Sequence, residues 1–577
     1  MRTLCLALAT ALALFSPLAH ADTSVPTAPA ALGTATAEPA VDESAMPWLK
    51  ARPEALQRWD DLTFGLFMHW DPSSLLGVEI SWHKQSRVDV AGEGDIPDAV
   101  YNNLYRSFNP AQFDARAFVQ VAKDAGMRYI VLTSKHHGGF CMFDSALTDF
   151  DIMNTAFKRD IVKELAEATR EAGLAFGFYY SQPDWHHPDF IRKDFDAYRP
   201  YLYGQLRELL TNYGRIDMIF FDGLFYGEKE YKSRELFKMI RELQPDVVIN
   251  NRCGLPADYD TPEQVVGAFQ NTRPWESCMT LGTSWSWKTY DTFKSPADCI
   301  RILVQTVGGD GNLLLNVGPM PTGIIEPRQA AILKQIGDWL RVNGESIYAL
   351  EGGPYKPSAW GACTSKDRTL YVHVLSWFDA PEFFPALPTR IASVTRLDGR
   401  PVAFTQDERG VRFEVPETER DPLNTILKVT LAPDGPAAAA IAPILVPTRS
   451  LARFQKVTAS HHPDTAALVV DDDPATEWTS PSRQCWIEVD LGADRRFDRV
   501  DIREEGHEWE PRTSDFELLI RAEGTAPDAW TTLDKGNKIG HTYSKSFAPA
   551  TARYIRLKIN DAGKLPHFSE IQVYTHP

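Results

Sequence analysis

The sequence MIFFDG, residues 218–223, is an apolar run that ends in a carboxylate and a glycine. Five similar runs, rich in β-branched or aromatic residues, lie before and after it. Together they predict strands at 64–70, 129–134, 176–181, 218–222, 247–250 and 313–317. Amphipathic stretches between them predict helices at 114–125, 160–172, 194–213, 233–243, 297–306 and 327–342. Because a repeated strand-then-helix order over ~300 residues builds a parallel sheet covered by helices, we predict a (β/α)8-like barrel over residues 47–348.

Downstream of residue 348 the pattern changes to an alternation of apolar and polar residues, with turn signals such as Asp398-Gly399 between the runs. A period of two is typical of half-buried strands, so residues 349–434 are predicted to form a small antiparallel β domain. An Ala- and Pro-rich stretch, 435–449, is predicted to be a linker with few groups able to hold it rigidly. Residues 450–577 alternate again and predict a C-terminal β-sandwich.

The N-terminal segment has the features of a secretory signal peptide. Arg2 precedes an apolar run, 4–15, and Ala19-His20-Ala21 forms a small-x-small cleavage site. A membrane anchor is the alternative, but the run is shorter than the ~20 apolar residues that a spanning helix needs. We therefore expect residues 1–21 to be a signal peptide and residues 22–46 a flexible leader. The protein is expected to be exported, periplasmic or secreted, without membrane insertion.

Composition narrows the class of partner. The chain has 77 Asp and Glu against 60 Lys and Arg, a formal net charge of −17. Nucleic acids and anionic membranes favour basic patches, so no nucleic-acid partner is expected. A hydrophobic fraction of 44% with 15 Trp indicates a globular chain with sizeable cores.

Polar clusters follow the predicted barrel strands at the point where each strand ends. The carboxyl ends of barrel strands meet at one mouth, where functional groups of this fold lie. The clustered residues include His69, His136, His137, Tyr179, Asp222 and Arg252. Carboxylate, imidazole, guanidinium and phenol groups, with tryptophans nearby, suit a sugar, whose ring stacks on aromatic faces and whose hydroxyls need donors and acceptors.

The pair His136-His137 also suggests a metal, because imidazole is the commonest metal ligand. Adjacent residues on a strand point to opposite faces, however, so we do not expect both to reach one ion. Neither an HxH nor an HExxH spacing supplies further ligands.

These motifs resemble α-L-fucosidases of glycoside hydrolase family 29. The resemblance covers roughly residues 48–348 and rests on six motifs in family order: 64–70, 135–140, 178–181, 221–223, 251–252 and 311–319. It implies that Asp222 is the nucleophile. It also implies that the side chains contacting fucose include His69, His136, His137, Tyr179 and Arg252, and that an aromatic residue at Trp285 lines the same pocket.

The acid/base is placed by its distance from the Asn-Arg motif. In the family it usually follows the Asn-Arg motif by about a dozen residues, which favours Glu263; the alternative is Glu276, otherwise a binding residue. The family often has a Glu-Trp pair in the loop after the first strand. Here Ser81-Trp82 stands in that loop, with Glu79 nearby. The resemblance therefore implies that Trp82 contacts the sugar. Because the Glu of the family's pair is replaced by Ser81, the contact to one fucose hydroxyl is expected to differ from that in the family.

The last 130 residues resemble a discoidin-like, family 32 type carbohydrate-binding module, mainly through the segments 471–478 and 553–557. Hard oxygen ligands hold Ca²⁺ in proteins, so the acidic turn Asp471-Asp472-Asp473 is a candidate structural Ca²⁺ site. A plain solvated turn is the alternative.

Taken together, the resemblance implies a secreted, retaining exo-α-L-fucosidase that acts on fucosylated oligosaccharides or glycoproteins and requires no cofactor for catalysis. Two alternatives come from other classes. One is a catalytically silent fucose-binding lectin on the same scaffold; the other is a metal-dependent barrel hydrolase.

Overall fold

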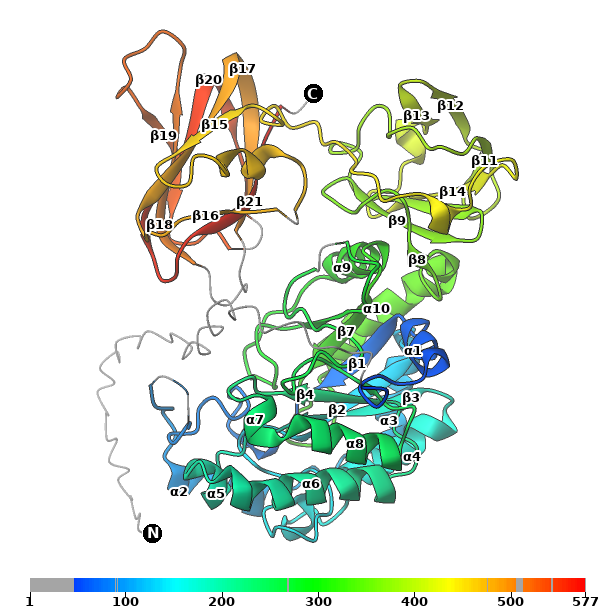
Figure 1. Ribbon diagram of the computed structural model, residues 1–577, viewed down its shortest axis with the longest axis vertical. Helices are drawn as coiled ribbons and strands as arrows, with labels where there is room; N and C mark the ends of the chain where they lie inside the picture. Colours follow the sequence, from blue (N-terminus) through cyan, green and yellow to red (C-terminus); the bar gives the residue numbers. More distant parts are fainter. Residues whose placement is uncertain are drawn as a thin grey trace, which may run out of the picture.

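The structure, a computed structural model, describes residues 46–88, 90, 92–266, 269–474, 476–504, 512–540 and 543–575. The predicted signal peptide, and all of the leader except Met46, lie outside these ranges. Figure 1 shows three bodies: a barrel domain below, and an antiparallel β domain and a C-terminal β-sandwich side by side above it. No helix within the described ranges is both long enough and apolar enough to cross a membrane.

The barrel domain is built on a parallel sheet with the strand order β5-β4-β3-β2-β1-β7-β6. Its strands are β1 (Phe64–Met68), β2 (Tyr129–Lys135), β3 (Ala175–Ser181), β4 (Met218–Asp222), β5 (Val248–Ile249), β6 (Glu276–Thr280) and β7 (Asn312–Val317). Six of these agree with the predicted strands to within a few residues. Strand β6 was not predicted, because Glu276, Ser277 and Thr280 interrupt its apolar pattern.

The two edges of the sheet, β5 and β6, are joined by the segment 258–264. Its backbone lies parallel to both: Asp258 donates to the carbonyl of Ile249, and Gln264 donates to that of Cys278, each at 2.9 Å. Isolated bridges pair Asn250 with Tyr259 and Glu263 with Cys278. This segment therefore closes the curved sheet into a barrel, in agreement with the predicted fold class.

Most of the helices cover the outside of the barrel, whereas Ala55 and Trp59 of the first helix pack into the core inside it. The helices are α1 (Pro53–Asp60), α2 (Asp98–Tyr101), α3 (Ala115–Asp124), α4 (Ile161–Glu171), α5 (Pro188–Ile191), α6 (Phe195–Asn212), α7 (Glu228–Tyr231), α8 (Ser233–Leu243), α9 (Pro296–Gly308) and α10 (Pro327–Asn343). Side-chain oxygens satisfy free backbone N–H groups in the first turn of several; the carboxylates of Asp114, Asp160 and Asp194 cap α3, α4 and α6.

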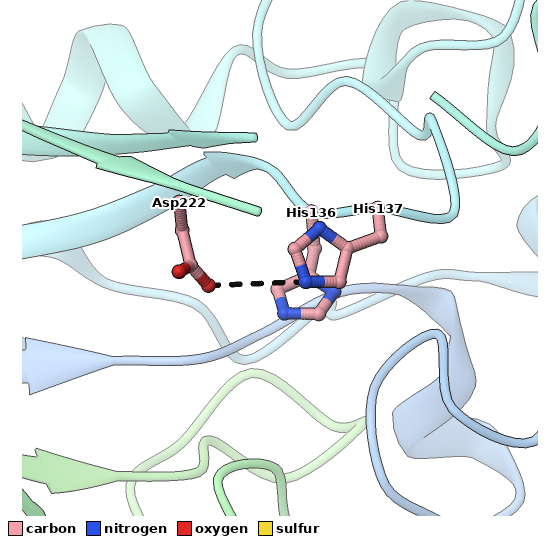
Figure 2. A group of neighbouring side chains, drawn as sticks. All are labelled: His136, His137 and Asp222. Carbon is pink, nitrogen blue, oxygen red and sulfur yellow. Dashed lines mark ion pairs between the residues drawn. The ribbon is translucent and has the colours of Figure 1, made fainter. Parts of the chain in front are cut away.

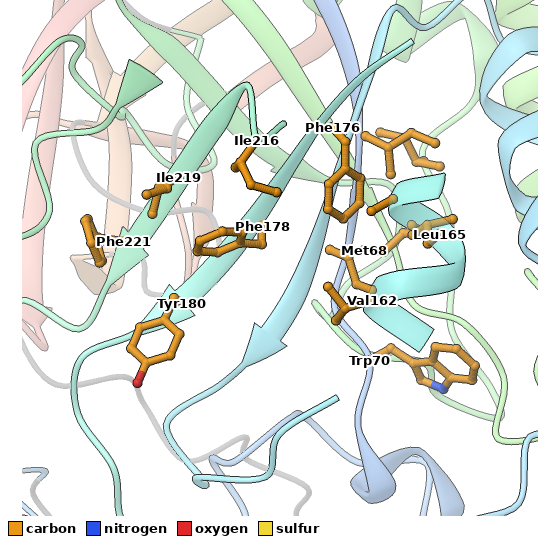
Figure 3. Close-up of a cluster of buried hydrophobic side chains, with 14 of the residues drawn as sticks. Met68, Trp70, Val162, Leu165, Phe176, Phe178, Tyr180, Ile216, Ile219 and Phe221 are labelled. Carbon is orange, nitrogen blue, oxygen red and sulfur yellow. The ribbon is translucent and has the colours of Figure 1, made fainter. Parts of the chain in front are cut away.

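Alternation along β3 separates two cores. Phe176, Phe178 and Tyr180 project from one face of β3 into the layer that Val162 and Leu165 of α4 also enter (Figure 3). The intervening Tyr179 belongs instead to the cluster inside the barrel. Because side chains alternate across a strand, the same short segment fills the outer core and supplies a polar group to the mouth.

The antiparallel β domain contains β8 (Glu351–Gly352), β9 (Gly361–Lys366), β10 (Thr369–Val374), β11 (Ile391–Thr395), β12 (Ala403–Asp407), β13 (Gly410–Glu414) and β14 (Thr425–Leu431). The stretch 435–449 connects it to the last domain but is not loosely held, contrary to expectation. Ile441 and Val446 are buried in the core of the β domain, and the backbone of Ile444 exchanges hydrogen bonds with Pro354 and Lys356. Apolar residues among the prolines and alanines account for this docking.

The C-terminal β-sandwich consists of β15 (Lys456–Ala459), β16 (Trp478–Thr479), β17 (Cys485–Glu504), β18 (Thr513–Arg521), β19 (Thr531–Gly536), β20 (Tyr543–Ala562) and β21 (His567–Tyr574). It contacts the β domain through charged and aromatic groups. Lys356 lies 3.5 Å from Asp473, and the ring of Phe378 packs 5.5 Å from that of Tyr574.

Candidate active site

Asp222 is the last residue of β4, and three groups converge on its carboxylate. The Tyr179 hydroxyl donates to Oδ2 at 2.8 Å, Arg252 Nη1 donates to Oδ1 at 2.9 Å, and His137 Nε2 lies 3.8 Å from Oδ2. The next residue, Gly223, has a φ of +96°, and a Cβ there would lie 2.4 Å from Pro183 Cγ. The turn after the strand therefore requires glycine.

The environment of Asp222 keeps it ionised. Burial by itself would raise the pKa of this carboxyl. The charge of the Arg252 guanidinium and the hydrogen bonds from Tyr179 and Arg252 outweigh burial, so the pKa lies below its usual range. A carboxylate that stays charged and is 21% exposed can act as a nucleophile toward a ligand in the mouth.

Glu263 lies near the end of the closing segment, and Arg252 links it to Asp222. Arg252 Nη1 contacts Glu263 Oε2 at 2.7 Å and Asp222 Oδ1 at 2.9 Å. Thr261 fixes the guanidinium from the side, because its hydroxyl and carbonyl accept from Nε and Nη2. Because Arg252 Nη1 touches both carboxylates, Asp222 Oδ1 and Glu263 Oε2 can be no farther apart than the sum of their distances to this nitrogen.

Three buried histidines line the same mouth, each oriented by a polar neighbour on Nδ1. The partners, each at 2.7 Å, are Asn316 for His69, Ser81 for His136 and Ser181 for His137. Burial lowers the pKa of His69 and of His137 to about 4. Burial also lowers the pKa of His136 well below its usual range. At neutral pH the three rings are therefore uncharged and suited to hydrogen bonds with hydroxyls.

Two indoles form walls of the mouth. The Trp285 ring lies 4.8 Å from that of His69, and the Trp82 ring lies 5.6 Å from that of His137 in an edge-on arrangement. Aromatic walls beside neutral donors and acceptors suit the apolar faces and hydroxyl edges of a pyranose. The structure thus brings together Trp82, Trp285 and the other predicted site residues apart from Glu276.

Glu276 is at the opposite end of the barrel. It is the first residue of β6 and is fully buried, and it accepts a hydrogen bond from the hydroxyl of Tyr129, the first residue of β2. Strand starts lie at the amino-terminal face, away from the mouth. The expectation that Glu276 contacts substrate or serves as the acid/base is therefore wrong, and the residue instead belongs to the barrel floor.

Glu276→Gln is expected to change pH-dependent stability rather than catalysis. Burial raises the pKa of Glu276 from its ordinary 4.5 to about 7. The folded state therefore binds a proton that the unfolded state releases, and this stabilisation is complete below about pH 4.5 and lost as pH rises through 7. The shift corresponds to about 3 kcal/mol.

Denaturant titrations at pH 5 and pH 8 would measure this effect. The wild type should lose stability over this interval relative to Glu276→Gln, while Glu54→Gln, a substitution of an exposed glutamate on α1, should behave as the wild type does. Parallel pH profiles for the wild type and Glu276→Gln would contradict the assignment.

His136, His137 and Asp222 also come close enough to consider a metal, as Figure 2 shows. One potential ligand atom from each lies within 4.8 Å of the others. The expectation that adjacent histidines cannot converge is wrong here, because both follow the end of β2, where strand alternation no longer applies. The Arg252 guanidinium already contacts Asp222, and its positive charge opposes a cation at this point.

Several residues that support the site were not identified from the sequence. The Gln182 side chain accepts from the Asp222 backbone N–H and donates to the Arg252 carbonyl, so it ties β4 to the loop after β5. The Asn316 Oδ1 accepts from His69 Nδ1, and its Nδ2 donates to the Trp285 carbonyl, each at 2.7 Å. A polar residue inside the apolar run of β7 was the available signal for Asn316.

A closed parallel barrel whose mouth holds two neighbouring carboxylates, neutral imidazoles and indole walls defines a glycoside hydrolase. The family model for alpha-L-fucosidase matches residues 33–345, more than half of the chain. The protein therefore belongs to the α-L-fucosidase family, glycoside hydrolase family 29, and is an α-L-fucosidase. A second model, the F5/8 type C (discoidin-like) domain, matches residues 455–571.

Individual relatives agree with this assignment. Human plasma alpha-L-fucosidase is 28% identical over 411 residues, covering 64% of this chain and 88% of its own. The structure of alpha-L-fucosidase isoenzyme 1 from Paenibacillus thiaminolyticus is 36% identical with a TM-score of 0.60, covering 66% of this chain and 99% of that one. An alpha-L-fucosidase from Vibrio sp. strain EJY3, at 23% identity, shares the fold over 92% of this chain and 99% of its own, with a TM-score of 0.62.

Proposed function

We propose that this α-L-fucosidase is a retaining exo-enzyme that releases terminal L-fucose from oligosaccharides or glycoproteins by double displacement. The observation that carries the proposal is the contact of Arg252 Nη1 with both carboxylates. It keeps these two oxygens closer together than the ~6.5–9.5 Å of inverting glycosidases, which favours the retaining class, whose carboxyl groups lie ~5–5.5 Å apart.

In the first step Asp222 Oδ attacks the anomeric carbon, and the bond from that carbon to the leaving oxygen breaks. Glu263, protonated, gives its proton to that oxygen, so the departing alcohol is neutral. The intermediate is a β-fucosyl ester of Asp222. Glu263, now a carboxylate, then takes a proton from water as the water attacks the anomeric carbon, which frees Asp222 and releases α-L-fucose.

The neighbours of the two carboxylates support these roles. Arg252 and Tyr179 stabilise Asp222 as an anion when it is the leaving group of the second step. The neutral histidines and the two indoles bind and orient the sugar without adding charge at the reacting carbon. An exo-mode of action follows from placing one sugar ring in a mouth closed below by the barrel core.

Hydrolysis of an aryl α-L-fucoside, followed by NMR from the first turnover, tests the proposal. Retention predicts α-L-fucose as the first product. Fucose binding without turnover would favour the silent lectin, and activity that is lost with a chelator and restored by a metal would favour the metal-dependent hydrolase.

We also propose a Ca²⁺ site in the C-terminal domain, at the acidic turn singled out in the sequence. The residues fit a hard cation: both carboxylate oxygens of Glu570 are buried and have no hydrogen-bond partner among the described residues, and they lie beside the negative charges of Asp471 and Asp472. The positive charge of Arg503 acts on Glu570 as well, but a buried carboxylate that accepts no hydrogen bond remains costly. Carboxylates of Glu570 and this turn would hold the ion, which would neutralise their mutual repulsion.

Calcium is accordingly expected to stabilise the C-terminal domain of the full-length protein. At a hundredfold excess over Kd the gain is about 2.7 kcal/mol. Thermal unfolding with CaCl₂ and with EGTA would measure it, and Glu570→Gln should abolish the difference. Equal unfolding temperatures for the wild type under the two conditions would contradict the site.

Two further proposals concern location and binding. The apolar run and cleavage site at the N-terminus support export, in which case the mature protein would begin at Asp22, as N-terminal sequencing would determine. The match to an F5/8 type C domain supports a role for residues 450–577 in binding glycan-bearing surfaces, which would raise the local substrate concentration.

A further inference from the structure

The segment 78–82 lies between the two walls of the sugar pocket and bonds to both. On one side it meets the loop that carries Trp285, and on the other it meets the loop that carries His136 and His137. These loops are separated from it by about 200 and about 55 residues of sequence. We call 78–82 the clamp segment.

Glu79 makes the contacts to the Trp285 loop. Its Oε2 accepts from the Trp285 backbone N–H at 2.8 Å and from the Ser284 hydroxyl at 2.5 Å. Its Oε1 accepts from the backbone N–H of Ser286 at 3.1 Å and of Ile80 at 3.0 Å. Glu79 is 9% exposed, so protein donors rather than water surround most of this carboxylate. Such charge-assisted bonds fix a loop more firmly than neutral ones do.

The Trp285 loop makes further contacts with neighbouring backbone and side-chain groups. Asn316 donates to the Trp285 carbonyl, the Ser286 hydroxyl donates to the Val78 carbonyl at 2.7 Å, and a Cβ at Gly318 would lie 2.2 Å from the Trp287 nitrogen. The backbone on both sides of the indole is therefore held by several contacts, of which Glu79 and the Val78 carbonyl supply those from the clamp segment. Because the oxygens of Glu79 are occupied in this way, they are not available to a sugar hydroxyl.

Ser81 makes the contacts to the histidine loop. Its hydroxyl oxygen lies 2.7 Å from His136 Nδ1 and accepts from the Gly138 backbone N–H at 2.7 Å. Its own N–H donates to the Tyr101 hydroxyl at 2.8 Å, and its φ of +62° lies in the left-handed region. A strained backbone held by hydrogen bonds on both sides is typical of positions that orient functional groups.

We propose that the clamp segment sets the width of the fucose pocket, with Glu79 as the positioning residue for Trp285 and Ser81 as the positioning residue for His136. Neither touches the reacting atoms. The inference rests on the proposed function only in naming the ligand; the two loops and their contacts are independent of the chemistry. Loss of either contact should weaken sugar binding in the ground state and transition state alike, which raises KM and leaves kcat nearly unchanged.

The test compares Glu79→Gln with Glu54→Gln in the full-length protein. Glu79→Gln keeps the size of the side chain but replaces one acceptor oxygen with an NH₂ group that faces N–H donors. We expect at least a tenfold rise in KM for an aryl α-L-fucoside and in the Kd for free L-fucose, with kcat within about threefold of the wild type. Glu54→Gln should change none of these.

Hydrogen exchange of the ligand-free protein provides a readout that does not depend on activity. In Glu79→Gln the amides of Trp285 and Ser286 should exchange at least tenfold faster, while those of β1 and β7 keep wild-type rates. Ser284→Ala removes one donor and leaves Glu79 in place, so it should show the same effects, smaller in size, even if Glu79→Gln does not fold. For the second contact, Ser81→Ala should likewise raise KM and accelerate exchange at Gly138.

Wild-type exchange rates and wild-type KM in Glu79→Gln and Ser284→Ala would overturn the role of Glu79, and the same result in Ser81→Ala would overturn the role of Ser81. A fall in kcat at constant KM would also overturn the proposal, because it would place these residues in the chemical step. Failure of the proposed function is distinguished from these outcomes by β-L-fucose as the first product of the wild type, which would overturn the retaining mechanism and leave the exchange prediction standing.

Discussion

Asp222→Ala is expected to lower kcat/KM for an aryl α-L-fucoside by about four to six orders of magnitude, because it removes the group that forms the covalent intermediate. The fold should persist. Asp222 is the partly exposed last residue of β4, and Arg252 keeps Glu263 as an ionic partner in the variant. Steady-state kinetics with circular dichroism on the same preparation would separate loss of chemistry from loss of structure.

Azide provides the stereochemical control for this variant. It should enter the space vacated by Asp222 and attack the anomeric carbon from the same side, so the rescued product is β-fucosyl azide, inverted relative to the α-fucoside. If the wild-type enzyme instead releases β-L-fucose as its first product, the enzyme inverts, and Asp222 is not a covalent nucleophile.

Glu263→Ala is expected to have an effect that depends on the leaving group. An activated aryl group departs with little protonation, so the first step, transfer of fucose from such a substrate to Asp222, should slow only modestly. A natural glycan, whose sugar alcohol leaves poorly, should lose about three to four orders of magnitude, in line with the combined loss of the acid and of the base. Rates across a series of aryl fucosides of graded leaving-group pKa would show a steeper dependence than in the wild type.

Glu276→Gln is the matched control for that series, because the residue is a second carboxylate placed close in sequence but at the barrel floor. It should keep the wild-type leaving-group dependence. A steep dependence in Glu276→Gln, together with azide rescue that gives the retained α-fucosyl azide, would mean that the acid/base has been assigned to the wrong carboxylate.

Local sequence determined the framework of this protein. The apolar runs that end at Met68, Lys135, Ser181 and Asp222 became strands because their length and their β-branched or aromatic content suit a buried parallel sheet. The polar groups that follow those runs then had to meet, since carboxyl ends of parallel strands share one face. For this reason His69, Tyr179 and Asp222 could be placed together from the sequence.

Only the tertiary structure decided which of two nearby glutamates lies at the mouth. Glu263 and Glu276 both precede short apolar stretches, and no local pattern separates them. The pairing of the closing segment with β5 and β6 puts Glu263 near the end of one strand-like segment and Glu276 at the start of the next strand, at opposite ends of the barrel. This register depends on closing the sheet, which is a non-local event.

The same reason explains the clamp segment and the paired histidines. The bonds of Glu79 join residues more than 200 positions apart, and His136 converges with His137 because the chain turns just after β2 ends. Periodicity and residue type act over a few turns or one strand. The sequence by itself therefore determined the elements and the residues at their ends, whereas contacts between loops, which arise only when the barrel closes, were decided by the tertiary structure.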